Sequence, residues 1–165
     1  MAAHSNITVE RLREVLHYDP VTGVFTWKTR TGPRNKPGMT ANARSVRGYF
    51  DITIDGRKYV SHRLAWLYMH GEWPKGEIDH INGRRDDNRW SNLRDVSRAL
   101  NMQNRRTASS LNSTKLLGVS RHGARWRARI QVDGVVQRLG TYDSPEAAHE
   151  AYLLAKRQLH VACEI

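Results

Sequence analysis

Cysteine and long apolar runs are the most evident absences from this sequence of 165 residues. The one cysteine, Cys163, excludes a disulfide framework or a cysteine-based zinc site within a single chain. No apolar run approaches the length of a membrane span, and the N-terminal residues lack the apolar core of a signal peptide. We therefore expect a soluble, cytoplasmic protein that does not associate with membranes.

Acidic residues are scarce, with 16 Asp and Glu against 27 Lys and Arg, which gives a net charge of +11. Such an excess predicts a polyanionic partner, most often nucleic acid. The long lysine tracts and amphipathic basic helices of ribosomal or membrane-surface proteins are absent. Arginine dominates over lysine, which suits contacts to phosphates and base edges. Five Trp, six Tyr and a hydrophobic content of 39% provide for a folded core.

The stretch from residue 77 to 104 combines a short apolar run with clustered polar side chains. The pattern predicts a strand ending in Asp79 and His80, a loop, a second short strand and a helix containing Asn101. If the helix packs back across both strands, Asp79, His80 and Asn101 can converge. Carboxylate and amide oxygens are hard ligands that suit one Mg²⁺ or Mn²⁺ ion. A histidine beside that metal can take a proton from water, so the stretch indicates phosphodiester hydrolysis.

Each of these features also has a plain structural explanation. Asp79 can cap a turn, Asn82-Gly83 favours a hairpin turn, and Asn92 and Asn101 can be solvated. Taken singly, each structural explanation is the stronger one. Together, in a fixed order, the features favour a nuclease.

Several separated segments share one pattern: His62-Arg63-Leu64-Ala65-Trp66, Asp79-His80-Ile81-Asn82-Gly83, Asn88-Arg89, Ser91-Asn92-Leu93-Arg94 and Asn101-Met102-Gln103-Asn104. They resemble an HNH nuclease of the homing type found in phage and group I introns, which has a ββα-metal fold. The resemblance covers roughly the first two thirds of the chain. Asn101 stands at the last position of the motif, where His is the named residue and Asn is a known variant.

The resemblance implies a role for each polar residue. Asp79 and Asn101 would hold one Mg²⁺ or Mn²⁺, His80 would be the general base, and Asn92 would hold the loop and orient His80. The substrate would be double-stranded DNA, cut by a monomer in a bacterial or phage-infected cell. Four arginines would contact phosphates: Arg84, Arg85, Arg89 and Arg94.

The N-terminal part predicts elements that support this stretch. Residues 7–17 predict a helix capped by Thr8, stopped at 18–20 and followed by a strand over 24–27. Residues 30–47 predict a loop, whose basic side chains either contact phosphates or are solvated: Arg30, Arg34, Lys36, Arg44 and Arg47, with Lys28 just before.

A hairpin and a helix are predicted next along the chain. Residues 48–60 predict a hairpin around Asp55-Gly56, and residues 62–70 a helix ended by Gly71. His62 and His70 are expected to be structural, although His62 lies near the site in the family pattern.

The C-terminal segment predicts a small sheet covered by a helix. Residues 105–115 are small, polar and basic, which is typical of a linker or of an extension that follows DNA phosphates. Residues 118–122, 124–132 and 135–142 predict three strands, and the second alternates apolar residues with Arg125, Arg127, Arg129 and Gln131. A helix from Ser144 to about His160 would cover the apolar face. The arginine row would then face an anion, as in sheets that enter the major groove.

This segment is similar to an AP2 DNA-binding domain in Gly118-Val119, Arg125-Trp126-Arg127-Ala128-Arg129-Ile130, Leu139-Gly140-Thr141-Tyr142, Ser144-Pro145-Glu146-Ala147-Ala148 and Ala151-Tyr152. AP2 modules are accessory domains of phage HNH homing nucleases. Ser120 and Arg129 depart from the plant pattern, so plant base preferences do not carry over. The resemblance implies DNA contacts by Arg121, Arg125, Arg127, Arg129, Gln131 and Arg138.

The predicted fold class is α+β in two parts. Residues 1–105 form the nuclease domain, with its ββα-metal core at about 76–105 and an N-terminal helix and hairpin at 7–71. A linker follows at 106–114, and residues 115–165 form a three-stranded antiparallel sheet with one packed helix. The alternative function is a non-catalytic DNA-binding regulator with a degenerate HNH part. An RNA-binding protein is the weaker third hypothesis, because the arginine face lacks stacking aromatics.

Overall fold

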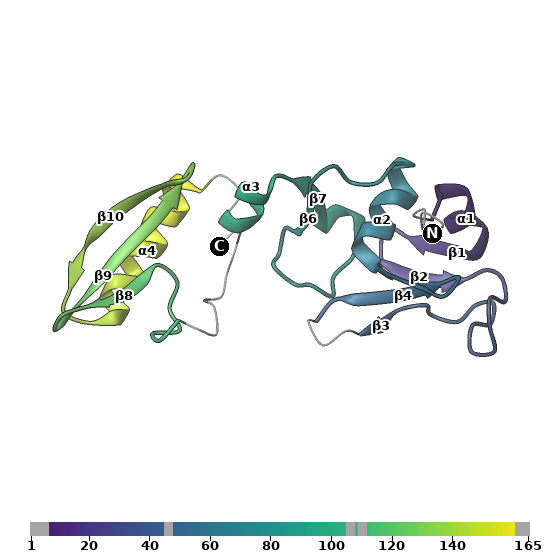
Figure 1. Cartoon of the computed structure of the whole chain (residues 1–165), viewed down its shortest axis with the longest axis horizontal. Coiled ribbons are helices and arrows are strands. Elements are labelled where there is room, and N and C mark those ends of the chain that lie inside the picture. The colour runs from purple at the N-terminus through teal and green to yellow at the C-terminus, as the bar shows by residue number, and fades with distance from the viewer. Residues whose placement is uncertain (1–6, 45–47, 105–107, 109–111, 161–165) are drawn as a thin grey trace, which may run out of the picture. The chain divides into compact units, whose positions relative to one another are not determined.

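The computed structural model describes residues 7–44, 48–104, 108 and 112–160, which Figure 1 colours by residue number. Arg47, Cys163 and most of the predicted linker lie outside the described residues. The chain divides into two compact units, Met1–Asp95 and Val96–Ile165. This division falls before the predicted linker at 106–114, so that linker stays a prediction.

The first unit begins with a short helix and a hairpin. Helix α1 (Val9–Val15) is capped by Thr8 as predicted, because the Thr8 hydroxyl accepts from the Arg11 amide at 3.3 Å. Strand β1 (Leu16–Asp19) then pairs antiparallel with β2 (Val24–Trp27). The prediction that the helix runs to residue 17 was wrong, because residues 16–19 bury alternate side chains against β2 and this pairing outweighs the helical pattern.

A second hairpin and a helix follow. Strands β4 (Phe50–Ile54) and β5 (Arg57–Val60) pair around Asp55 and Gly56, both at positive φ, so this predicted hairpin is confirmed. Strand β3 (Ala43–Arg44) pairs with β4 inside the predicted loop, which was therefore wrong at these two positions. Helix α2 (Ser61–His70) ends at Gly71 in the left-handed conformation, as predicted.

The core of the first unit also anchors the polar stretch. Leu12, Phe25 and Leu64, each fully buried, join one hydrophobic cluster with Ile78 and Leu93. Ile78 lies on β6 (Glu77–His80) and Leu93 begins β7 (Leu93–Val96), and the two strands pair. Between them lie a loop and the short 3₁₀ helix η1 (Trp90–Asn92), and α3 (Arg98–Gln103) follows β7. The predicted order of strand, loop, strand and helix is thus present.

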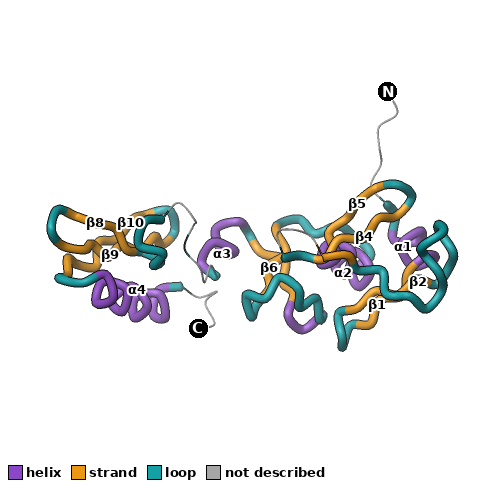
Figure 2. The backbone as a smooth tube through the Cα atoms, turned by 90° about the horizontal axis from the view of Figure 1, so that it is seen from below, coloured by secondary structure: helices purple, strands orange, loops and turns teal. Residues whose placement is uncertain are grey.

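The second unit contains a three-stranded antiparallel sheet in the order β10-β9-β8. Its elements are β8 (Val119–His122), β9 (Arg125–Val132), β10 (Val135–Tyr142) and α4 (Pro145–Leu159). Figure 2 shows α4 running along one face of this sheet. The Ser144 hydroxyl caps α4 by accepting from the Ala147 amide at 3.1 Å, and Pro145 begins the helix, as the sequence predicted.

Small side chains bring α4 close to the sheet. Ala128 and Ile130 of β9 pack against Ala148 and Tyr152 of α4 in two adjoining apolar clusters. Gly118 lies in contact with the Tyr152 ring at φ +72°, where a side chain would collide with the ring. The predicted sheet with one packed helix is therefore the observed arrangement of this unit. Over the described residues, no helix has both the length and the apolar character needed to cross a bilayer.

Candidate functional site

Strand β6 places Asp79 and His80 at its buried end. The pattern of burial along β6 leaves only Glu77 partly exposed, and Asp79 and His80 are 6% and 5% exposed. The chain then turns sharply, because Gly83 donates from its amide to the His80 carbonyl at 2.8 Å and adopts φ 72°. Asp79 and His80 are thus two consecutive, buried, ionisable residues at the start of a turn.

The loop after β6 is held by the Asn92 side chain. Its Oδ1 accepts from the Asn82 amide at 2.9 Å, and its Nδ2 donates to the Asp87 carbonyl at 2.7 Å. The Asp87 carboxylate in turn accepts from Asn82 Nδ2 at 2.7 Å. Asn92 therefore ties both ends of the loop together, the loop-holding role predicted for it.

The direct contact with the His80 ring comes from Asn88, a residue that the sequence analysis did not place in the site. Asn88 Oδ1 lies 3.0 Å from His80 Nε2, and Asn88 is 2% exposed. Asn92 bonds to the loop backbone and Asn88 contacts the ring, so the predicted orienting role of Asn92 would act through the loop and stays a prediction. The available signal was the Asn88-Arg89 pair in the family pattern.

Aromatic rings surround His80 on its other sides. His62 meets it edge-on at 5.0 Å between ring centroids, and Tyr49 lies 5.9 Å away. Burial lowers the pKa of His80, an effect that the Asn88 hydrogen bond opposes. Burial, with the nearby His80, lowers the pKa of His62 to about 3. Both imidazoles are therefore neutral at neutral pH, the form that accepts a proton.

His62 is buried in this cluster with an unsatisfied ring nitrogen. Among the described residues, its Nδ1 has no hydrogen-bond partner. The sequence analysis expected His62 to be structural, and its edge-on packing between Tyr49 and His80 is consistent with that role.

The Asp79 carboxylate forms an ion pair with Arg94 of β7. Its Oδ2 accepts from Arg94 Nε at 2.9 Å and Nη2 at 2.8 Å. The Arg94 side chain is 26% exposed, so the pair is largely shielded from solvent. The guanidinium predicted to contact phosphate is instead engaged with the predicted metal-binding carboxylate.

The other loop arginines differ in their contacts. Arg89 donates twice to Asp87, at 2.8 and 2.6 Å, and so fixes the loop rather than reaching outward. Arg85 lies over the Tyr49 ring at 5.2 Å, and Arg84 is 70% exposed with a loose contact of 3.7 Å to Asp86. Of the four arginines predicted to contact phosphate, Arg89 and Arg94 thus each bond to a carboxylate through two nitrogens.

The geometry is that of a histidine held by an amide beside a buried carboxylate, on a strand, loop and strand. Residues 59–103 match the HNH endonuclease family model. The HNH segment begins in β5 and runs through α3, so it contains every site residue predicted in the first two thirds of the chain. A comparison with curated proteins found no match to this chain.

The predicted metal ligands of the HNH segment fall in different units. Asp79 belongs to the first unit, whereas Asn101 lies on α3 in the second, with its amide bonded to the Ser97 carbonyl at 3.0 Å. Within the described residues, no group of three or more His, Cys, Asp or Glu side chains is placed to hold a metal.

The sheet of the second unit has one basic face. Register places Arg129 opposite Arg138, and Arg127 opposite Ser120 and Thr141, so these side chains share a face. Arg125 shares it too, and its Nε contacts Asp143 at 2.8 Å. Trp126, Ala128 and Ile130 lie on the other face, as the alternation predicted.

Arg121 does not belong to the basic face. It pairs in register with Trp126, and its guanidinium lies 5.9 Å from the centre of the Trp126 ring on the side of α4. Its predicted DNA contact stays a prediction, and such a contact would be made away from the face that carries Arg127 and Arg129. His122, opposite Arg125, lies on the basic face instead.

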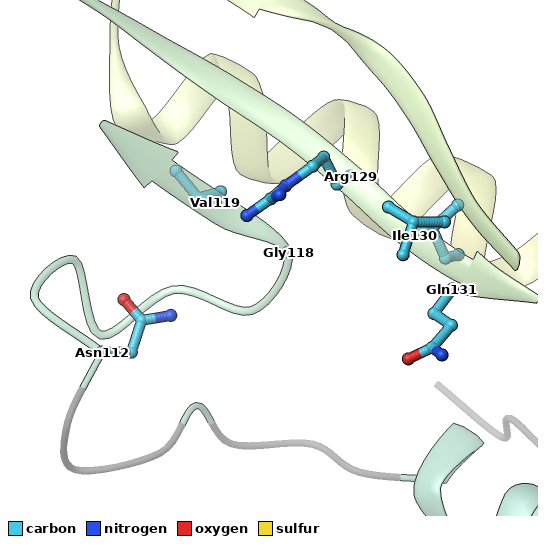
Figure 3. A pocket seen from close by; sticks show the side chains of 7 residues that line it. Asn112, Gly118, Val119, Arg129, Ile130 and Gln131 are labelled. Carbon is cyan, nitrogen blue, oxygen red and sulfur yellow. The ribbon is translucent and has the colours of Figure 1, made fainter. Parts of the chain in front are cut away.

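A pocket of about 360 Å³ opens beside β9 where β8 begins. Arg129 and Gln131 line it from β9, Val136 from β10 and Asn112 from the preceding loop. Figure 3 shows Arg129 and Gln131 projecting from β9 on the side where Asn112 lies. Gln131 also donates to the Gly134 carbonyl at 3.2 Å. Polar side chains thus gather at this end of the sheet.

Proposed function

We propose that this protein is a metal-dependent DNA endonuclease of the homing type that hydrolyses one phosphodiester bond per active site. The observation that carries the proposal is the contact between Asn88 Oδ1 and His80 Nε2, next to Asp79, within the segment that matches HNH endonucleases. A histidine exposed to solvent, with no role in a reaction, would need no buried amide to hold its ring. The net charge of +11 supports DNA as the substrate.

The proposed mechanism assigns a protonation state to His80. His80 would carry its proton on Nε2 and donate it to Asn88 Oδ1, 3.0 Å away. Nδ1 would then be the nitrogen that takes a proton from the attacking water as the general base. Burial lowers the pKa of His80, which keeps this nitrogen unprotonated at neutral pH.

Asp79 and Asn101 would hold one Mg²⁺ or Mn²⁺ ion. Both offer hard oxygen donors. The ion would stabilise the negative charge that develops on the phosphate and on the leaving oxygen. Asn92 keeps the loop closed, so that His80 stays at the end of β6.

The sheet of the second unit would act as an AP2-like targeting module. Its support is the shared face of Arg127, Arg129 and Arg138 opposite the face covered by α4. Exposed guanidiniums in a row repel one another, and a DNA groove relieves that repulsion while offering guanine edges. The residues proposed for DNA contact are Arg125, Arg127, Arg129, Gln131 and Arg138.

A non-catalytic DNA-binding protein is the second candidate, and the ion pair of Asp79 with Arg94 favours it. A carboxylate neutralised by a neighbouring arginine needs no metal ion for its stability. In that case the HNH segment would serve only as a structural support.

Nicking of supercoiled plasmid separates the two candidates. We expect wild-type protein to nick in Mg²⁺ or Mn²⁺ and to stop when EDTA is added. Replacement of His80 by Ala should abolish nicking while the control His17→Ala, at an exposed position on β1, keeps it. DNA binding without metal-dependent nicking would overturn the endonuclease proposal in favour of the second candidate.

A further inference from the structure

The hairpin of β1 and β2 contacts the loop that carries Asn88, although it lies outside the HNH segment. The Tyr18 hydroxyl donates to the Asn88 carbonyl at 2.6 Å, between residues that are 1% and 2% exposed. Burial raises the pKa of Tyr18, so the hydroxyl stays protonated and able to donate. A short, buried hydrogen bond thus joins two segments separated by 70 positions in the sequence.

The turn between β1 and β2 adds two contacts to the same loop. The Pro20 carbonyl accepts from the Trp90 amide at 2.9 Å. Gly23, at φ +74°, lies against the backbone of Asn88 and Arg89, where any side chain would collide with it. The backbone of residues 88–90 is therefore held from one side by Tyr18, Pro20 and Gly23.

Asn88 connects this support to His80. Its carbonyl accepts from Tyr18, and its side-chain Oδ1 meets His80 Nε2 at 3.0 Å. Its Nδ2 is buried and has no hydrogen-bond partner among the described residues. The direction of the amide therefore depends on the His80 contact and on the placement of the Asn88 backbone, which Tyr18 helps to fix.

We propose that Tyr18 is a positioning residue for the nuclease reaction: through Asn88 it holds the His80 ring in the orientation used for proton transfer. This inference rests on the proposed function of His80 as general base. It assigns a role in the reaction to the N-terminal hairpin, which the HNH match at residues 59–103 does not include.

The Tyr18 ring and the Tyr18 hydroxyl have separable roles. The ring packs against Phe25 and Tyr68, with centroids 4.8 and 5.8 Å away, as part of the core. The hydroxyl alone reaches Asn88. Tyr18→Phe therefore keeps the packing and deletes only the hydrogen bond.

Tyr59→Phe is the matched control. The Tyr59 hydroxyl also bonds to a distant backbone group, accepting from the Ile7 amide at 3.3 Å, but it lies on β5. Each variant thus loses one tyrosine hydroxyl and one contact between the N-terminal part and the rest of the first unit. Only Tyr18→Phe loses the contact to Asn88.

The experiment measures plasmid nicking and the ring-nitrogen NMR signals of His80 in full-length protein. We expect Tyr18→Phe to lower kcat by about 10-fold or more, the effect typical of residues that orient a catalytic group, with little change in KM. The His80 signals should report Nε2–H in the wild type and shift in Tyr18→Phe. Tyr59→Phe should leave both readouts at wild-type values.

A double variant tests whether Tyr18 acts through Asn88. Asn88→Ala should lower kcat by about 10- to 100-fold, and adding Tyr18→Phe to it should cost nothing further. Additive losses, equal losses in Tyr59→Phe, or unchanged His80 signals in Tyr18→Phe would each overturn the proposal. If the wild type does not nick DNA, the proposed function fails, and the His80 signals of the two tyrosine variants still decide whether Tyr18 positions the ring.

Discussion

At the residue scale, burial determines the chemical state of His80. A buried imidazole disfavours its charged form, which is why its pKa lies below the ordinary value. Asn88 Oδ1 contacts the ring at Nε2, 3.0 Å away. Under the proposed function, His80 would act as the base in a state set by burial and by this contact.

Replacing His80 by Ala should reduce cleavage by about 10² to 10⁴-fold, the range typical of a general base, while DNA affinity stays within a few-fold of wild type. The physical reason is that the base acts on a proton and contributes little to duplex affinity. Cleavage kinetics and gel-shift titrations measure the two effects. Near-wild-type turnover would remove His80 from the mechanism.

Asp79→Ala and Asn101→Ala should each shift cleavage to higher Mg²⁺ or Mn²⁺ concentrations. Each change removes one of the two hard oxygen donors proposed to bind the metal ion. Asp79→Asn serves as a second variant, because it keeps the size of the side chain beside Arg94 and so limits disturbance of folding. A metal titration identical to wild type for either position would exclude that residue as a ligand.

At the element scale, the loop between β6 and β7 is stabilised by a carboxylate. Arg89 and then Asn82 bond to Asp87 and lower its pKa to about 2. Because the folded state lowers this pKa, the contribution of Asp87 to stability is present above the ordinary value near 4 and is lost as pH falls toward 2.

Asp87→Asn should therefore destabilise the first unit most at neutral pH. The difference in stability between wild type and variant should shrink as pH falls from about 5 to about 2, since the wild-type carboxylate becomes protonated there. Urea unfolding at several pH values measures it. A difference that does not change with pH would show that the charge of Asp87 contributes nothing.

Substitutions on the two faces of β9 should have different effects, one on stability and the other on DNA binding. Ile130→Ala should destabilise the second unit by about 2 to 5 kcal/mol, because Ile130 is 2% exposed and packs against α4. Arg129→Ala should leave the fold intact and cost about 1–3 kcal/mol at a specific base pair, or about one unit of salt slope at a phosphate.

Thermal unfolding and DNA titrations at several salt concentrations distinguish the two β9 variants. Ile130 is a better probe of this core than Trp126, because Trp126 is only partly buried. Equal losses of stability in Arg129→Ala and Ile130→Ala would contradict the assignment of faces.

At the scale of the whole molecule, cleavage and targeting are assigned to different segments of the chain. Deleting residues 112–165 should leave a protein that still nicks DNA in Mg²⁺, with weaker affinity and relaxed site choice. The reason is that the proposed catalytic residues all precede residue 112, whereas the basic sheet face follows it. Mapping of cleavage sites with full-length and truncated protein tests this division, with circular dichroism to confirm folding. The same sites at the same affinity would exclude a targeting role.

Much of the local structure was predictable from residues close in sequence. Asp55-Gly56 determines a tight hairpin because both adopt positive φ, and Ser144-Pro145 determines the start of α4 through a cap and a fixed φ. The alternation along β9 assigns its two faces for the same reason, since successive side chains of a strand point to opposite sides. In the site, the family pattern identified Asp79, His80 and Asn92.

Only the tertiary structure decided which groups meet across the chain. Residues 16–19 form strand β1 because they pair with β2. Arg121 lies on the face opposite the basic one because it pairs in register with Trp126. Arg94 bonds to Asp79, Asn88 to His80 and Tyr18 to Asn88 through contacts between separate segments. Such contacts depend on how the elements pack rather than on local propensity. The sequence by itself therefore determined the secondary-structure elements and the chemistry of the polar residues. The tertiary packing determined which of those residues contact one another.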